Sequence, residues 1–300
     1  MNMASSQRFH GIVPAMATPF TEHGDLDEPR ITELIEWYLS CGVHGISVAG
    51  SQGEFFALEE HEHIRLIEVA ATAVAGRVPL LAGTGATTTQ ATIRITRAAE
   101  KAGADLAMVI TPYFIQPKQA ELAQHYIEVA AAVSLPILLY NNPPRTSINI
   151  LPTTLAECMD RASNIVGIKD SSGDVTQGIE YKLSTNGKAL LFSGRDTIAL
   201  SLLMHGADGS VSPAANVFPA EMIRLYDAFR QGDFAEARRL SDIFAPLRAA
   251  WAWGSFPVVI KEAMGLVDQS AGPARKPIAP LTADRRSQLR QVIESIQANA

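Results

Sequence analysis

Short apolar runs recur along the whole chain, and each is followed by turn residues such as Gly, Pro or Asn. There are eight of them, and they cover residues 11–19, 45–50, 78–85, 106–112, 136–142, 165–170, 190–194 and 208–213. Their hydrophobicity is nearly continuous and does not alternate strictly with polar positions. This pattern is typical of parallel strands that are covered on both faces. The sequence therefore predicts eight parallel strands.

The segments between these runs carry apolar residues at helical spacing. One of them has Pro117 at an expected first-turn position and a face made of Leu122, Tyr126, Val129 and Val133. Another shows the same spacing at Ile64, Ile67, Ala71 and Val74. Parallel strands need crossovers of this length, and eight strand–helix units are enough to close a (β/α)8 barrel. An open doubly wound sheet is the competing α/β architecture.

After the eighth run the pattern changes to helices alone. The helical segments begin near residues 219, 234, 257 and 281. We expect residues 1–224 to form the catalytic (β/α)8 TIM barrel and residues 225–300 to form a C-terminal helical extension of the same domain. No low-complexity linker separates the two parts.

The composition is typical of a soluble globular protein and favours small-molecule chemistry. Of the 300 residues 47% are apolar and 19% charged, and the formal net charge is −6. No basic stretch interleaved with aromatics indicates a nucleic-acid partner. No apolar stretch reaches the roughly 20 residues of a membrane helix. The first residues lack the apolar centre of a signal peptide, and Cys41 and Cys158 lie far apart, so a reducing, cytoplasmic location is expected.

In a barrel the reactive groups follow the carboxyl ends of the strands. The polar and aromatic residues at those ends include Ser51, Gln52, Glu54, Thr111, Tyr113, Phe114, Tyr140, Arg145, Lys169 and Gly194.

Lys169 is the most informative of these residues, because it directly follows the apolar run 165–168. Lysine is usually a solvated surface residue. At the mouth of an apolar barrel, desolvation favours the neutral amine, which is a nucleophile toward a carbonyl. We therefore expect Lys169 to form an imine with a 2-oxo acid. The cationic imine then acts as an electron sink, so neither a metal nor a separate cofactor is needed.

Three supporting groups lie at or after the ends of the second and fifth runs, and each has a plainer alternative. Tyr140 either packs against a strand end or serves as a general acid and base for the imine. Arg145, on a proline-stiffened loop, is either solvated or binds a carboxylate. The glycines around Ser51 and Gln52 either make an ordinary turn or aim backbone N–H groups at the carboxylate of the oxo acid.

Several segments, taken in order, resemble the dihydrodipicolinate synthase and N-acetylneuraminate lyase family of Schiff-base aldolases. The matching segments are "GSQGE" at 50–54, "TPYF" at 111–114, "YNNPPRT" at 140–146, "GIKDSSGD" at 167–174 and "SPAANV" at 212–217. The resemblance implies a (β/α)8 barrel with a helical extension, a homotetramer built as a dimer of dimers, and pyruvate as the shared substrate or product.

The resemblance also implies roles for individual residues. Lys169 matches the imine-forming lysine and Tyr140 the proton-shuttling tyrosine. Ser51 and Gln52 fall on positions near the pyruvate carboxylate, and Arg145 matches the arginine that binds the carboxylate of aspartate semialdehyde in the synthase branch. The positions of Gly194 and Val211 line the pocket in that family.

Two departures from the synthase branch bear on the substrate. That branch has two threonines where this chain has Ser51 and Gln52, and it has a second tyrosine, reaching across a subunit interface, where this chain has Phe114. Phenylalanine cannot relay a proton, so the relay is incomplete unless Tyr113 or a water substitutes.

The leading hypothesis is a lyase or synthase that joins pyruvate to an aldehyde, or releases it, in the manner of 4-hydroxy-tetrahydrodipicolinate synthase. Arg145 favours this reading. Gln52 favours an aldolase or dehydratase of 4-hydroxy-2-oxoglutarate or 2-keto-3-deoxy sugar acids. A barrel that only binds a 2-oxo acid, without catalysis, is the alternative from another class.

Overall fold

The computed structural model describes residues 8–300 and contains one sheet of eight parallel strands. The strands are β1 (Gly11–Pro14), β2 (Ile46–Val48), β3 (Leu80–Gly83), β4 (Leu106–Ile110), β5 (Ile137–Asn141), β6 (Ile165–Asp170), β7 (Leu190–Ser193) and β8 (Gly209–Ser212). Each lies within one of the eight apolar runs, so the predicted strands are confirmed.

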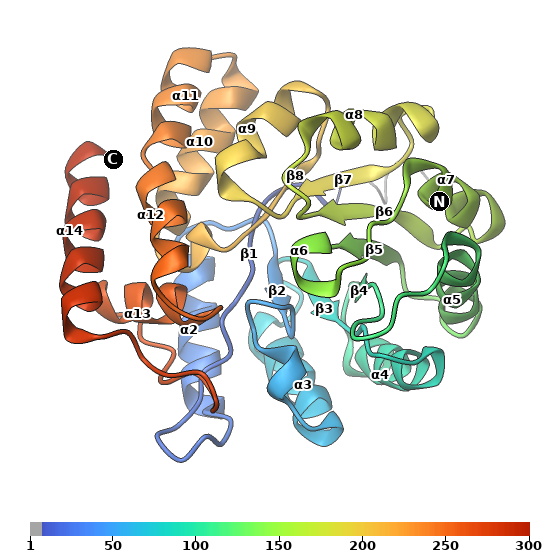
Figure 1. Ribbon diagram of the computed structural model, residues 1–300, viewed down its shortest axis with the longest axis horizontal. Coiled ribbons are helices and arrows are strands. Elements are labelled where there is room, and N and C mark those ends of the chain that lie inside the picture. Colours follow the sequence, from blue (N-terminus) through green and yellow to red (C-terminus); the bar gives the residue numbers. More distant parts are fainter. Residues whose placement is uncertain (1–7) are drawn as a thin grey trace.

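The sheet curls into a nearly closed barrel. Each strand from β2 to β8 pairs with the next in sequence, and β8 pairs with β1, where Gly11 lies opposite Gly209. Between β1 and β2 a single parallel bridge joins Ala15 to Ser47. Pairing of the first strand with the last excludes the doubly wound alternative and confirms the (β/α)8 barrel. Figure 1 shows the helices arranged around these strands.

Helices follow the strands in the expected order. The barrel helices are α2 (Glu28–Ser40), α3 (Glu60–Val74), α4 (Thr89–Ala102), α5 (Gln119–Ala131), α6 (Pro143–Thr146), α7 (Pro152–Arg161), α8 (Val175–Ser184), α9 (Asp196–Met204) and α10 (Pro219–Gln231), with short 3-10 turns η1 (Phe55–Ala57) and η2 (Ala214–Asn216). Their ends follow ordinary capping chemistry: in α4, the Thr88 side chain accepts from Ala91 N, and Gly103 ends the helix at φ +93°.

The first predicted helix has wrong bounds, whereas the second is confirmed as α3. Helix α5 begins at Gln119 after the cap residue Lys118, so Pro117 lies before the helix and not in its first turn, and Val133 lies beyond its end. In α3 the buried side includes His63, whose Nε2 lies 2.7 Å from Gly83 O. That contact turns the helix so that Ile64 is only half-buried.

The apolar side chains form two layers. One buried cluster, which includes Val13, Leu138 and Val211, comes mainly from the strands and fills the barrel interior. The larger cluster, which includes Ile12 and Leu139, lies between the strands and the surrounding helices. Strand residues thus alternate between the two clusters, which fixes the face that each side chain at a strand end presents.

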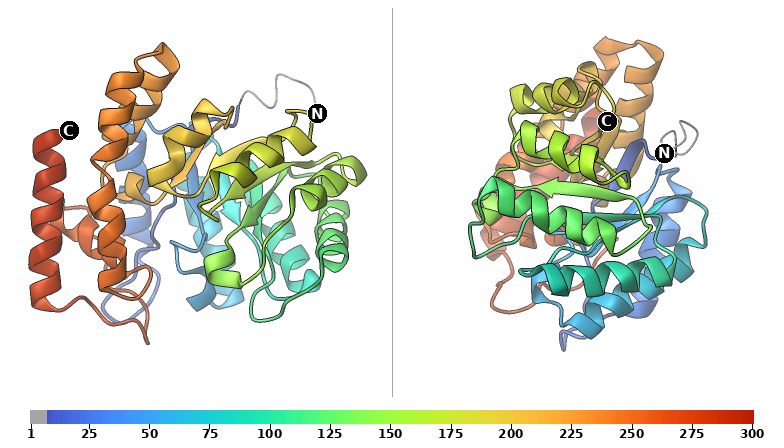
Figure 2. Two further views of the ribbon diagram at one scale, coloured as in Figure 1. Left: turned by 45° about the horizontal axis from the view of Figure 1, so that its top comes forward. Right: turned by 90° about the vertical axis from the view of Figure 1, so that its right-hand side faces the viewer.

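The remaining elements form a helical layer beside the barrel. They are α11 (Phe234–Asp242), α12 (Ala245–Ala250), η3 (Trp251–Trp253), α13 (Val258–Leu266) and α14 (Ala283–Asn299). Figure 2 shows α12 and α14, in orange and red, on the opposite side of the molecule from the green α5 and α7. The predicted boundary between residues 224 and 225 falls inside α10, which follows β8 as the last barrel helix; a boundary drawn by elements comes after Gln231.

Two ion pairs, the first of them buried, tie this layer to the loop after β2 and to α3. Lys261 Nζ lies 2.7 Å from Glu54 Oε1, and both side chains are almost fully buried. Arg275 Nη2 lies 2.5 Å from Glu62 Oε1. The extension therefore contacts the segment that carries Ser51 and Gln52. Among the helices of residues 8–300, none combines the length and the apolarity that crossing a membrane requires.

Candidate active site

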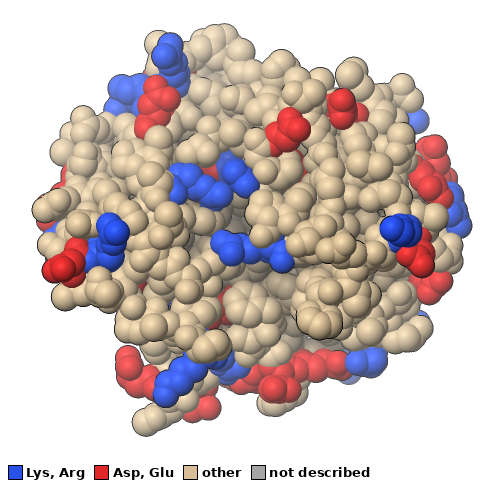
Figure 3. Space-filling view, in the orientation of Figure 1, with Lys and Arg blue, Asp and Glu red and all other residues tan. Residues whose placement is uncertain are grey.

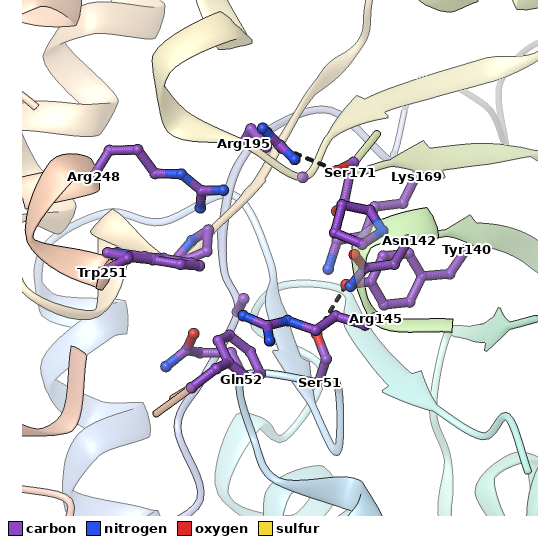
Figure 4. A pocket seen from close by; sticks show the side chains of 15 residues that line it. Ser51, Gln52, Tyr140, Asn142, Arg145, Lys169, Ser171, Arg195, Arg248 and Trp251 are labelled. Carbon is purple, nitrogen blue, oxygen red and sulfur yellow. Dashed lines mark hydrogen bonds between the residues drawn. The ribbon is translucent and has the colours of Figure 1, made fainter. Parts of the chain in front are cut away.

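The predicted site residues meet around an open cavity at the carboxyl ends of the strands. Ser51, Gln52, Tyr140, Arg145, Lys169 and Gly194 all line it. They come from the ends of β2, β5, β6 and β7 and from α6, and their side chains point toward a shared space (Figure 4). This is the face of a barrel on which catalytic groups gather.

A bulge in β6 turns Lys169 toward the barrel interior. The pairing of β6 with β5 skips Val166, so Val166 is an extra residue in the ladder. Ile165 and Ile168 both belong to the outer cluster, whereas Val166 belongs to the interior one. Because side chains alternate beyond the bulge, Lys169 faces inward. A regular strand starting from Ile165 would send Lys169 outward.

Lys169 is buried, with 3% of its surface exposed. Its Nζ lies 4.1 Å from the centre of the Tyr140 ring. Burial lowers the pKa of Lys169 below its ordinary value, and negative charge on Tyr140 or Asp196 would oppose this without cancelling it. The amine is therefore neutral at a lower pH than a solvated lysine.

Tyr140 lies directly beside Lys169 in the register of β5 and β6. Its hydroxyl is 2.8 Å from Ser51 Oγ and accepts a 2.9 Å hydrogen bond from Asn142 Nδ2. Burial alone would raise the pKa of Tyr140, but the Lys169 charge and the hydrogen bonds from Ser51, Ser171 and Asn142 together bring it below its ordinary value. The phenol therefore loses its proton more readily than an ordinary tyrosine and can exchange it with its neighbours.

Ser51 and Gln52 lie on a tight loop after β2. Ala49 and Glu54 take the left-handed conformation, at φ +53° and +54°, and a Cβ on Gly53 would meet Met16 O at 2.9 Å. Gln52 is 2% exposed, and neither atom of its amide has a hydrogen-bond partner in the described structure. A buried amide of this kind offers a donor and an acceptor to a ligand.

Two glycines are required by close contacts at the site. A Cβ on Gly194 would lie 1.9 Å from Ser171 Oγ, and one on Gly167 would lie 2.0 Å from Leu190 O. Gly194 therefore lines the cavity because no larger residue fits beside Ser171. Gly167 lets β6 and β7 approach at the bulge.

Arg145 is an exposed residue of α6, the single turn after β5. Its guanidinium carbon lies 4.2 Å from the centre of the Phe256 ring, which comes from the extension. Burial lowers the pKa of Arg145 below its ordinary value. The contact with Phe256 holds the guanidinium plane at the cavity rim.

Two predicted residues do not line the cavity. Val211 is fully buried in the interior cluster that also contains Tyr140. Phe114 is 99% exposed, with φ +73°, and is not among the residues that line the cavity. Tyr113 lines a neighbouring hollow together with Ser51 and Arg145.

Six further polar or aromatic residues line the cavity without having been predicted. They are Asn142, Ser171, Arg195, Arg248, Trp251 and Phe256. Asn142, Ser171 and Arg195 follow strands β5, β6 and β7, so the strand-end rule that found Tyr140 and Lys169 also points to them. The other three come from the extension, where Trp251 packs against the core and also lines the cavity.

Acidic and metal-binding side chains are sparse around this cavity. Within residues 8–300 no group of three or more His, Cys, Asp or Glu side chains is arranged to hold a metal ion. Asp196 is buried next to the cavity, where its carboxylate accepts hydrogen bonds from Ser212 Oγ and from Ala214 N. Burial raises the pKa of Asp196 above its ordinary value.

Comparison with known proteins places this geometry in a large group of enzymes. A model of the dihydrodipicolinate synthetase family matches residues 8–296. Proteins named 4-hydroxy-tetrahydrodipicolinate synthase from Methanoculleus marisnigri and Thermodesulfovibrio yellowstonii are 42% and 38% identical to this chain. Each match covers at least 95% of this chain and 98% of the relative.

Solved structures agree with the sequence relatives. YagE from E. coli K12, a prophage protein of the dihydrodipicolinic acid synthase family solved in complex with pyruvate, has a TM-score of 0.92 and 33% identity. The match covers 96% of this chain and 99% of YagE. The dihydrodipicolinate synthase of Acinetobacter baumannii, also complexed with pyruvate, has a TM-score of 0.92 and 34% identity. Here the coverage is 97% of this chain and 99% of that one.

Proposed function

The chain belongs to the dihydrodipicolinate synthetase family, and from this premise we propose that Lys169 carries out its chemistry as an imine. The protein is a pyruvate-dependent lyase or synthase that forms or cleaves a C–C bond between pyruvate and an aldehyde. The observation that carries the imine is the buried Lys169 amine, held 4.1 Å from the Tyr140 ring at the cavity floor.

The proposed reaction begins when the neutral Lys169 amine attacks the ketone carbon of pyruvate. Proton transfer and loss of water leave a cationic imine, whose nitrogen withdraws electrons so that a proton leaves the methyl carbon. The resulting enamine carbon attacks the aldehyde, and the aldehyde oxygen takes up a proton. Water then hydrolyses the product imine and frees Lys169. The reverse sequence cleaves the bond, and in neither direction does the proposal require a metal or a cofactor.

Tyr140 is the proposed proton carrier. Its ring lies beside the amine, and its hydroxyl is within hydrogen-bond distance of Ser51. Because Phe114 cannot relay a proton, the relay proposed here runs from Tyr140 to Ser51 and continues to a water or to Tyr113, which shares a hollow with Ser51.

The second substrate is proposed from the arginine at the rim. Arg145 supports an aldehyde that carries a carboxylate, as in 4-hydroxy-tetrahydrodipicolinate synthase, the name of the related proteins. Gln52 supports the runner-up, an aldolase or dehydratase of hydroxylated 2-oxo acids. Its unpartnered amide suits a substrate hydroxyl.

Steady-state assays separate these candidates. Consumption of aspartate semialdehyde together with pyruvate would support the synthase assignment, and we expect Lys169→Ala to abolish turnover of whichever substrate is used. Cleavage of 4-hydroxy-2-oxoglutarate or 2-keto-3-deoxygluconate without any use of semialdehyde would remove the synthase assignment. Binding of pyruvate with no turnover of any of the three would favour a barrel that only binds 2-oxo acids.

The proposed assembly rests on exposed apolar side chains, and the proposed location on the cysteines. Large apolar side chains of Phe56, Phe114 and Ile115 are exposed, which is unusual for a monomer and supports burial by another copy. We propose a homotetramer, a dimer of dimers, in the cytoplasm, without a nucleic-acid or membrane partner. Both cysteines are unpaired, as suits a reducing compartment.

A further inference from the structure

Three arginines converge on the cavity from separate parts of the chain. Arg145 comes from α6, Arg195 directly precedes α9, and Arg248 belongs to α12 of the extension. All three line the cavity, together with the imine-forming Lys169. Figure 4 shows them around the same central space, and in Figure 3 blue Lys and Arg atoms gather around a hollow near the middle of that face.

None of the three arginines forms a salt bridge with a carboxylate in the described chain. Arg145 instead lies over Phe256, and the guanidinium carbon of Arg248 lies 4.0 Å from the centre of the Trp251 ring. Arg195 donates from Nε to Ser171 O at 3.0 Å. The aromatic rings hold two of the guanidinium planes while their N–H edges stay available.

The positive charges of these arginines act against one another across the cavity. The nearest buried carboxylate, Asp196, already accepts from Ser212 and Ala214. Burial and the charges of Arg195 and Arg145 lower the pKa of Arg248, although Asp196 acts in the opposite direction. An anionic ligand between the arginines would relieve their mutual repulsion.

Gln52 gives independent evidence that a ligand belongs in this space. Its side chain lines the cavity, is 98% buried and has no hydrogen-bond partner for either amide atom in residues 8–300. Buried amides are normally satisfied, so a polar group supplied by a ligand is the expected partner.

Charge matching then indicates how acidic the ligand is. A single carboxylate on the second substrate would occupy Arg145 and leave Arg195 and Arg248 without a counter-charge. We propose that the second substrate carries two acidic groups: one is bound by Arg145, and the other, a carboxylate or a phosphate, is bound jointly by Arg195 and Arg248. This proposal rests on the imine chemistry proposed above, and it favours dianionic aldehydes or oxo acids over aspartate semialdehyde, which has a single carboxylate.

Non-reacting analogues test the charge requirement separately from the chemistry. Calorimetric titration of the pyruvate-saturated enzyme with glutarate, pentanoate and 4-phosphonobutyrate compares two carboxylates, one carboxylate, and a carboxylate with a phosphonate on chains of similar length. We expect glutarate or 4-phosphonobutyrate to bind about tenfold tighter than pentanoate, or more, since charge-assisted hydrogen bonds are the strong ones. The tighter of the two identifies the second acidic group.

Arg195→Met and Arg248→Met should each remove most of that preference, whereas Arg290→Met, at an exposed position of α14, should keep it. Equal affinity for pentanoate and both dianions, or a preference that survives both cavity variants, would overturn the proposal. Borohydride trapping of pyruvate in each variant reports on Lys169 independently. A trapped adduct without a dianion preference defeats only this inference, and no adduct in the parent protein defeats the proposed function instead.

Discussion

Replacement of Tyr140 by phenylalanine removes one oxygen from the centre of the site. That oxygen accepts from Asn142 Nδ2 at 2.9 Å and lies 2.8 Å from Ser51 Oγ, and Asn142 and Ser51 are both buried. The ring itself, which lies against Lys169 Nζ at 4.1 Å, is retained. The variant therefore tests the proton-carrying role of the hydroxyl while the packing around the amine is kept.

The expected effect has a kinetic part and a stability part. Loss of a general acid and base reduces turnover by about 10²- to 10⁴-fold. Two buried polar groups lose a partner, and each unsatisfied group costs about 1–3 kcal/mol. Imine formation should remain detectable but slow, because Lys169 is unchanged.

Tyr126→Phe is the matched control. Tyr126 is also fully buried, but its hydroxyl has no hydrogen-bond partner in the described structure. Removing that hydroxyl should leave turnover unchanged and leave the free energy of unfolding equal or higher.

The assay measures steady-state turnover, the rate of borohydride-trapped imine in a single turnover, and unfolding in urea for both variants. We expect only Tyr140→Phe to slow imine formation and turnover. Parent-like turnover in Tyr140→Phe would refute the proton-carrying role of Tyr140. An equal loss of turnover in Tyr140→Phe and Tyr126→Phe would show that the hydrogen bonds of Tyr140 with Ser51 and Asn142 do not contribute to catalysis.

Further expectations concern stability, pH dependence and assembly. Lys261→Met leaves the buried Glu54 without its ion-pair partner and should lower the free energy of unfolding in urea by about 3–5 kcal/mol. An unchanged urea midpoint of unfolding would show that this pair does not stabilise the fold. Burial lowers the pKa of Lys261 to about 8 from 10.5, so the unfolded chain binds more protons between these values and stability should rise with pH in that window. In Lys261→Met the free energy of unfolding should rise less steeply with pH over this window. The same slope in the variant as in the parent would show that Lys261 is not the group responsible. Gly194→Ala places a Cβ 1.9 Å from Ser171 Oγ. This clash should lower the free energy of unfolding by about 1–3 kcal/mol and reduce the turnover rate, as measured by unfolding in urea and by steady-state kinetics. Phe114→Asp should dissociate the assembly in light scattering, and an unchanged mass would place Phe114 outside the interface.

The fold could be predicted because its signal is local. Each buried parallel strand is an apolar run bounded by turn residues. Eight such runs that alternate with helices are compatible with only a few α/β folds. Lys169 and Tyr140 could be found for the same reason, because both end such runs. The bulge at Val166 could not be predicted, since it depends on how β6 pairs with β5. Without it Lys169 would face the wrong side.

The part of the cavity lining that comes from the extension depends on contacts between distant parts of the chain. Arg248, Trp251 and Phe256 reach the site only because the extension packs beside the barrel, and nothing in their own segment distinguishes them from core residues. Arg195 was within reach of the strand-end rule, as it directly follows Gly194. The turn of α3 that buries His63 likewise depends on a long-range contact, the one with Gly83 O.

Mass spectrometry after borohydride reduction with pyruvate tests the central claim most directly. The account predicts one reduced adduct, located on Lys169 and lost in Lys169→Ala but retained in Lys261→Met, although Lys261 is also a buried lysine. An unmodified Lys169 at saturating pyruvate, or an adduct on another lysine, would contradict it.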